Sequence, residues 1–461
     1  MVNKDATGND AKQLLTAKDC FFMAMGATIG AGIITNTGIA IGIAGTGVVI
    51  AYILAFTTYY VGHFPLIIMS SIKPVYSCHY VYTQWLGQRL AGVYMYIFLI
   101  GRVSQAFMGI AFGTYLASIV DIPPAVGGIA VLTLLYVINL LGMKSSARLQ
   151  NVITAVLILA IVSFVFLGLP KVNYDAFFLK ENLFFGGAMG MFNAIAILLF
   201  GTGGAFLILP MGPKIIRPET TIPRVVSIAQ VCACLLFCAV AFVGAGVGPL
   251  SEVAGQPMTY QALIIYPGNW YLLFVIGGAL LAIITTINAN YIYYYTSMLK
   301  GCEDGWMPRW FAKLNRNGVP HRLLTLFWLI AVIPLALGMD LGQLVSVAAA
   351  LTLAQTLVPL WGLVKLPALY PELWAKSRFY MPTPFLYVLT GFCTALLLTF
   401  IVINFVKFSL AVLVAVLLLI ALSIIIVVVF GKQIVENNDK RKAEEALTAP
   451  REAALESAEA V

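Results

Sequence analysis

The chain has 461 residues, of which 61% are hydrophobic and only 10% are charged, so most of its surface cannot face water. This composition excludes an ordinary soluble domain. With three histidines and no His-Asp-Cys cluster, the sequence also argues against an enzyme.

Apolar runs of the length needed to cross a bilayer, roughly 20 residues, follow one another along the chain. They cover residues 20–42, 46–72, 90–120, 124–142, 149–169, 188–210, 223–248, 271–299, 323–339, 342–366, 384–406 and 408–431. We therefore predict an all-α polytopic membrane protein with about twelve transmembrane helices. A polar N-terminal segment, 1–19, precedes them. A polar tail, 432–461, follows them, and we expect it to form a short helix or none.

The net charge of +8 is unevenly distributed over the predicted loops. Most of the 27 Lys and Arg residues lie in the two terminal segments and in alternate loops, whereas the remaining loops hold only Lys171, Lys180 and Lys407. Short loops rich in Lys and Arg stay on the cytoplasmic side. The pattern predicts a multi-pass protein of the plasma (inner) membrane with both termini cytoplasmic, and it gives no support to nucleic-acid binding.

The first apolar run contains MGATIGAGIITNTGIAIGIAGTG, residues 25–47, in which Gly26, Gly30 and Gly32 each weaken a helix. One interpretation is close helix packing, since Gly26 and Gly30 have the spacing of a small-residue contact motif. The other is a broken helix that exposes the backbone from Thr28 to Gly32 to a substrate. This run alone does not decide between them.

The third apolar run places one cation deep in the membrane: Arg102, in YIFLIGRVSQAFMG. None of the nineteen Asp and Glu residues falls in the middle of a predicted span, which argues against carboxylate-driven proton pumping and against an acidic channel ring. Arg102 then either caps backbone carbonyls or snorkels, or it lines a cavity and attracts an anionic group. His63, beside a proline, is expected to be structural.

The sixth apolar run repeats the glycine pattern, in AILLFGTGGAFLILPMGPK, residues 196–214. Two glycine-broken helices at corresponding places indicate a transporter built from two inverted repeats. The repeats are predicted at 20–169 and 188–366, with two additional helices in 384–431. Backbone amides freed at a half-helix N-terminus bind a carboxylate, and freed carbonyls hold an ammonium group or a cation.

Several segments are similar to signatures of a known family. They are GATIGAGI at the first break, NLLGMKSSARLQNVIT at 139–154, RPETTIPRVV at 217–226, TTINAN at 285–290 and EDGWMPRWFAKLNRNGVP at 303–320. Together they resemble the amino acid-polyamine-organocation (APC) transporters over about residues 15–380. The resemblance implies a LeuT-like fold of five plus five helices with two more, and transport of amino acids or related amines by alternating access, as a permease or an exchanger.

The resemblance also implies where the substrate binds. The substrate carboxylate is expected at the first break, on Thr28, Gly30, Ala31 and Gly32. The amino group is expected at the second break, on Phe200, Gly201, Thr202 and Gly204. An aromatic lid is expected from Phe200 or Phe206, and contacts to the substrate side chain from Gln355 and Thr356.

The sequence departs from the family where ion coupling is concerned. A lysine that many members carry in the fifth span is Leu157 here, so proton coupling through that position is not expected. A sodium ion near Thr285 and Thr286, a proton bound elsewhere or no coupling ion remain open, and no cofactor is expected.

The substrate class rests on Arg102, which favours an amino acid or derivative with an extra negative charge. A neutral amino acid, carried by sodium-coupled transport or uncoupled exchange, is the alternative. A sensor is less favoured, because the sequence shows no large soluble domain, and a channel is less favoured, because polar faces do not recur along several of the predicted helices. The oligomeric state stays open.

Overall fold

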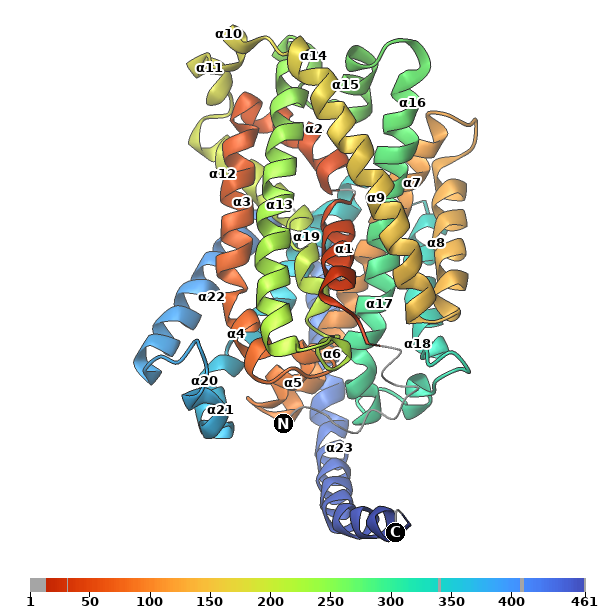
Figure 1. The fold of residues 1–461 in the computed structure, drawn as a ribbon, viewed down its shortest axis with the longest axis vertical. Helices are drawn as coiled ribbons and strands as arrows, with labels where there is room; N and C mark the ends of the chain where they lie inside the picture. The colour runs from red at the N-terminus through yellow and green to blue at the C-terminus, as the bar shows by residue number, and fades with distance from the viewer. Residues whose placement is uncertain (1–13, 31, 339–340, 407–409, 460–461) are drawn as a thin grey trace.

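The computed structural model describes residues 14–30, 32–338, 341–406 and 410–459. Within these ranges the chain folds into one bundle of helices (Figure 1). The described part has no β-sheet, only two isolated bridges, Leu15–Ile215 and Tyr76–Met211. Apolar segments in lipid must satisfy their backbone hydrogen bonds internally, and helices do so. The predicted all-α polytopic class is confirmed.

The first five apolar runs form helices, several of them interrupted. The segments are α1 (Ala17–Thr28), a π-helical turn η2 (Gly32–Asn36), α2 (Thr37–Ala44), η3 (Gly45–Gly47), α3 (Val48–Gly62), α4 (Phe64–Ile72), α5 (Cys78–Gln84), α6 (Gln88–Ile100), η4 (Gly101–Val103), α7 (Ser104–Ala117), α8 (Pro124–Leu140), α9 (Met143–Gly168) and η5 (Leu169–Lys171). The run that contains Arg102 is divided by the 3₁₀ turn η4, which the sequence did not predict.

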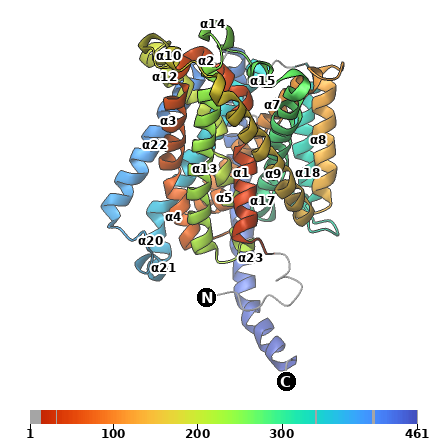
Figure 2. The same cartoon turned by 45° about the horizontal axis from the view of Figure 1, so that its top comes forward.

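The next four runs follow the same plan, with short helices in the loops between them. They are α10 (Tyr174–Phe177), α11 (Lys180–Leu183), α12 (Gly187–Leu198), η6 (Leu199–Gly201), η7 (Gly204–Ile208), η8 (Gly212–Lys214), α13 (Pro218–Gly246), α14 (Leu250–Val253), α15 (Met258–Ile265), η9 (Gly268–Trp270), α16 (Tyr271–Leu273), the π-helical η10 (Phe274–Leu280), α17 (Leu281–Glu303), η11 (Arg309–Ala312) and α18 (His321–Ala336). The small helices α10, α14 and α15 gather at one end of the bundle (Figure 2).

The last part of the chain contains α19 (Leu341–Leu360), α20 (Gly362–Leu369), α21 (Pro371–Ala375), α22 (Thr383–Phe405) and α23 (Leu410–Glu459). Across the described residues, eight helical segments are long and apolar enough to cross a membrane, and Pro124–Leu140 and His321–Ala336 are shorter apolar helices. The number twelve and the division into two repeats stay predictions.

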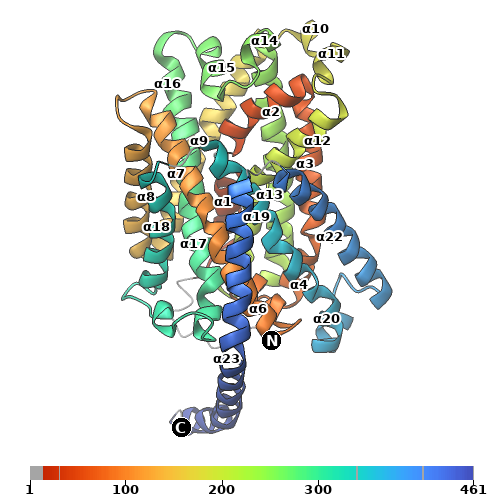
Figure 3. The ribbon, with the colours of Figure 1, turned by 180° about the vertical axis from the view of Figure 1, so that it is seen from behind.

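The polar tail differs from the expectation of a short helix or none. It continues α23 to Glu459 without a break, and α23 packs against α6 before it leaves the bundle (Figure 3). Near that point Asp304, 1% exposed, pairs with Arg441 at 2.8 Å and Lys300 at 3.5 Å and accepts hydrogen bonds from Tyr80 and Gln84. One buried carboxylate thus joins α5, the end of α17 and α23.

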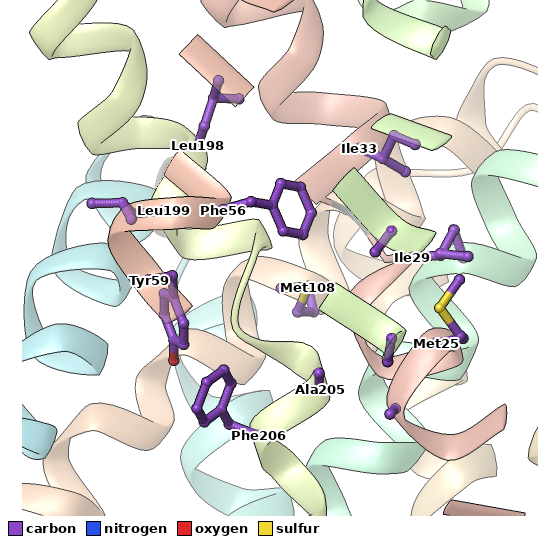
Figure 4. Close-up of a cluster of buried hydrophobic side chains, with 14 of the residues drawn as sticks. Met25, Ile29, Ile33, Phe56, Tyr59, Met108, Leu198, Leu199, Ala205 and Phe206 are labelled. Carbon is purple, nitrogen blue, oxygen red and sulfur yellow. The ribbon is translucent and has the colours of Figure 1, made fainter. Parts of the chain in front are cut away.

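The apolar core of the bundle is continuous with the interrupted segments. Figure 4 shows Met25, Ile29 and Ile33 of the first run in one cluster with Leu199 and Phe206 of the sixth, and all five side chains are buried. Close packing of this kind couples the two interruptions, because displacing either segment by itself opens voids.

Candidate substrate site between two broken helices

The first run is broken where the sequence predicted. Helix α1 ends at Thr28, whose hydroxyl donates to Ala24 O at 2.7 Å, and Ile29 leaves the helical conformation with φ −76° and ψ 76°. Helical structure resumes at Gly32. The carbonyl end of α1 and the amide end of η2 therefore face the same gap. They bring opposite partial charges to the gap, and such ends bind the two ends of a zwitterion.

The sixth run is broken at the matching glycines. The turn η6 ends at Gly201, Thr202 and Gly203 lie between the helical turns, and η7 begins at Gly204. The Thr202 hydroxyl is buried and donates to Leu199 O at 3.1 Å, so it satisfies its own segment. This break also presents a carbonyl end and an amide end to its gap.

The two breaks contact one another through backbone. A methyl group added at Gly32 would lie 2.6 Å from the Cα of Gly201, far inside the roughly 3.5–4.0 Å of favourable carbon contact. One added at Gly204 would overlap the backbone of Ala27 and Thr28. The glycines at the two breaks thus interrupt the helices and also let the interruptions touch, whereas a packing role for the Gly26–Gly30 pair stays a prediction.

A cavity of about 90 Å³ lies at this junction. It is lined by ten of the twelve residues predicted to contact the substrate, which are Thr28, Gly30, Gly32, Arg102, Phe200, Gly201, Gly204, Phe206, Gln355 and Thr356. Thr202 is not among the lining residues, since its hydroxyl is turned to its own backbone. Ala31 lies outside the described residues. The structure therefore brings together nearly all of the predicted set.

Arg102 is 4% exposed and reaches the cavity from η4. Its Nε donates to Phe98 O at 2.9 Å, and its Nη2 donates to Gln355 Oε1. The guanidinium carbon lies 3.9 Å from the ring centre of Phe98 and 4.3 Å from that of Tyr294, in cation–π geometry. The side chain thus bonds a carbonyl of its own run and also lines the cavity, and its attraction for an anionic group stays a prediction.

The cavity is electropositive. No Asp or Glu occurs among the described residues that line it, and Arg102 forms none of the salt bridges found in the described part of the chain. Rings and amides stabilise a buried guanidinium but leave its unit charge uncompensated.

The predicted aromatic residues differ in what they contact. Phe206 packs edge-on against Tyr59, with ring centres 5.3 Å apart, and the two side chains point toward each other in Figure 4. Phe200 packs against Phe107 at 5.6 Å and is half-buried. Phe206 is thus held by Tyr59, which also lines the cavity, whereas Phe107, the partner of Phe200, does not line it.

Of the two threonines predicted to hold a cation, one lines the cavity. Thr286 lines the cavity beside Gly30, whereas Thr285 is not among the lining residues. Both hydroxyls donate to Ala282 O, at 3.1 and 2.8 Å, which leaves their oxygen lone pairs free to face a cation. A sodium ion here stays a prediction. Leu157, in place of the family lysine, is fully buried.

Sequence reasoning missed most of the aromatic and histidine lining. Besides those discussed, the cavity is lined by Tyr59, His63, His79, Tyr94, Asn290, Tyr293 and Tyr294. The run NYIYYY, residues 290–295, could have predicted this lining. A buried tyrosine hydroxyl needs a hydrogen-bond partner, so four tyrosines close together in one span indicate polar partners or a polar cavity beside them. His63 was expected to be structural, yet its ring lines the cavity.

These features define a polytopic helical membrane transporter with a polar cavity between two broken helices. The family model described as amino acid permease matches residues 15–430, so the chain belongs to the amino acid permease family, as a divergent member of the APC superfamily. It is a transporter and not an enzyme.

Named relatives are distant in sequence. A branched-chain amino acid permease of Lactococcus lactis is 23% identical over 409 residues, 81% of this chain and 86% of the relative. A D-serine/D-alanine/glycine transporter of Escherichia coli K12 is 22% identical over 335 residues, 68% of this chain and 70% of the relative. An uncharacterized amino acid permease of Bacillus subtilis is 22% identical over 363 residues, 73% and 77%.

Proposed function

We propose that the protein carries an amino acid, or a derivative of one, with an additional anionic group across the plasma membrane by alternating access. The observation that carries the proposal is Arg102, a buried cation without a carboxylate partner among the described residues, at a cavity formed by two broken helices. A guanidinium in this setting gains most from an anion that arrives with the substrate.

The proposal assigns the parts of the substrate to parts of the cavity. The amide end of the first break, at Gly32, receives the α-carboxylate, and the carbonyl end of the second break, at Phe200 and Gly201, receives the ammonium group. Arg102 and Gln355 receive the second anionic group. The two broken runs, α1 with η2 and α12 with η7, then change their tilt about the breaks and open the cavity to one side of the membrane at a time. The basic loops and both termini lie on the cytoplasmic side.

A neutral amino acid is a second candidate. It is favoured by the partners that Arg102 already has, Phe98 O and Gln355. It is also favoured by two of the named relatives, a branched-chain amino acid permease and a D-serine/D-alanine/glycine transporter. In that case Arg102 stabilises the fold, and the broken helices alone recognise the substrate.

Counterflow into proteoliposomes separates the two candidates. Vesicles loaded with unlabelled substrate receive labelled glutamate, leucine, lysine or tyrosine, with and without sodium. The proteins compared are the wild type, Arg102→Ala and the control Arg316→Ala, whose exposed side chain lies outside the cavity. We expect glutamate uptake that Arg102→Ala abolishes and Arg316→Ala preserves. Leucine or tyrosine uptake that survives Arg102→Ala, without any glutamate uptake, establishes the neutral candidate instead.

A further inference from the structure

Two of the three histidines line the substrate cavity. His63 and His79 both border it, whereas His321 begins α18 and does not. No carboxylate is present among the described lining residues, and Leu157 stands where the family lysine is expected. The histidines are therefore the lining side chains whose ordinary pKa lies closest to neutral pH.

His63 is held in one orientation. It is 1% exposed at the junction of α3 and α4, and its Nδ1 lies 2.8 Å from Tyr59 O. A carbonyl oxygen only accepts, so Nδ1 carries the hydrogen and Nε2 of the neutral ring carries a lone pair. Nε2 is buried and has no hydrogen-bond partner among the described residues. A buried nitrogen without a partner needs an explanation in a native structure.

The ring of His63 is connected to the break in the sixth run. It stacks on Tyr59, with ring centres 3.8 Å apart and an interplanar angle of 6°, and it lies 5.3 Å from Phe206. Tyr59 in turn fills the space above Gly203, where a Cβ atom would overlap its ring. A charge placed on His63 therefore acts directly on the aromatic contacts that hold η7.

We propose that Nε2 of His63 binds a proton that is transported together with the substrate. The proposal rests on the anionic substrate proposed above. Arg102 and His63 line the same buried cavity, so the positive charge of Arg102 opposes the addition of a second positive charge at His63 while the cavity is empty. An anionic group on Arg102 cancels that repulsion. Proton and anion then strengthen each other's binding by the same factor, as linkage requires.

The surroundings of His63 agree with this coupling. The other ionisable groups at the cavity come from α5, η4, α3, α6 and α17, and they are His79, Arg102, Tyr59, Tyr94, Tyr293 and Tyr294. All are cationic or neutral near neutral pH. The proton adds to the Nε2 lone pair from the more acidic side and leaves to the other side after the cavity reopens.

The test is glutamate accumulation in proteoliposomes with an inward proton gradient and the membrane voltage clamped at zero. With one proton per substrate, each pH unit raises the accumulation ratio about tenfold. We expect this stimulation in the wild type and in the control His321→Gln, and its loss in His63→Gln. Stimulation that persists in His63→Gln, or that only His79→Gln removes, overturns the assignment to His63.

A second measurement keeps the proposal testable if His63→Gln takes up no glutamate at all. Adding glutamate to weakly buffered, solubilised wild-type protein should remove about one proton per bound glutamate from solution, because the proposal links glutamate binding to protonation of His63. Binding without proton uptake contradicts the proposal. Failure of the anionic-substrate proposal is seen separately, as absence of glutamate counterflow without any gradient.

Discussion

Arg102 and Gln355 are hydrogen-bonded to each other across the cavity lining although 253 positions separate them in the chain. Gln355 also donates from Nε2 to Leu351 O at 2.7 Å, which turns its oxygen toward the guanidinium. The partner that α19 supplies is thus neutral. A carboxylate at the same place would bind the guanidinium more tightly and would cancel its charge.

The identity of residue 355 therefore controls the charge available to the substrate. We expect Gln355→Glu to lower glutamate counterflow at least about tenfold, or about 1.4 kcal/mol, because an internal ion pair replaces the substrate's partner. Gln355→Leu keeps the free charge on Arg102 and should keep the preference for glutamate over leucine. Wild-type glutamate uptake by Gln355→Glu would show that Arg102 does not receive the substrate.

The backbone contact between the breaks leads to a second prediction. Gly32→Ala and Gly201→Ala should each reduce counterflow of any substrate about tenfold or more, because a methyl group forces the two segments apart and alters the cavity. Gly391→Ala is the matched control, since its added methyl group meets no atom within 4 Å and Ala suits the middle of α22 better than Gly. Equal activity of Gly32→Ala and Gly391→Ala contradicts the proposed role of the contact.

The buried carboxylate at Asp304 should stabilise the fold. We expect Asp304→Asn to lower the free energy of unfolding by about 3 kcal/mol, because Arg441 and Lys300 lose a partner that is itself buried. Thermal unfolding in detergent measures this effect. Asp121→Asn, at an exposed loop position without an ion pair in the described residues, serves as the control. A double variant with Arg441→Met should lose less than the sum of the single losses.

Asp19 gives a pH-dependent prediction at the start of α1. Partial burial acts to raise the pKa of this carboxyl, but hydrogen bonds from the Thr16 hydroxyl and N–H and from Asn151 outweigh it, so the pKa lies below 3.8. The carboxylate then contributes stability that is present above the ordinary pKa and is lost as the pH falls through the lowered one.

Asp19→Asn should accordingly destabilise the protein by about 1 kcal/mol near neutral pH, as for loss of a capping interaction. Thermal unfolding followed from neutral to strongly acidic pH checks this, with wild type and variant compared at each pH. The difference between the two should disappear as the pH drops below about 4. A difference that stays constant over that range shows that the charge of Asp19 is not what stabilises α1.

Much of this arrangement follows from local sequence. Glycines in apolar runs predicted both helix breaks, because a helix weakened inside a membrane is tolerated only where other parts of the protein satisfy its backbone. Arg102 was found for a similar reason, since an arginine deep in an apolar run is too unfavourable to be incidental.

The partners of these residues could not be predicted in the same way. Gln355 joins Arg102 only after α19 packs beside η4, and nothing within a few residues of either encodes that contact. His63 was expected to be structural because its neighbourhood shows only a helix junction before a proline. Its importance depends on Phe206 from a distant run and on the direction that Tyr59 O imposes on its ring.

The meeting of Gly32 and Gly201 has a mechanical consequence. Where side chains interdigitate, sliding one helix past another requires rotamers to change and voids to open, and each step adds to the barrier. Here the backbone at Gly32 faces the backbone at Gly201 with no side chain between them. Under the proposed alternating access this contact would act as a pivot, because backbone can turn against backbone without a change of rotamer. The resistance to rocking would then come from the surrounding aromatic contacts, such as that of Tyr59 with Phe206, where a bound substrate would adjust it.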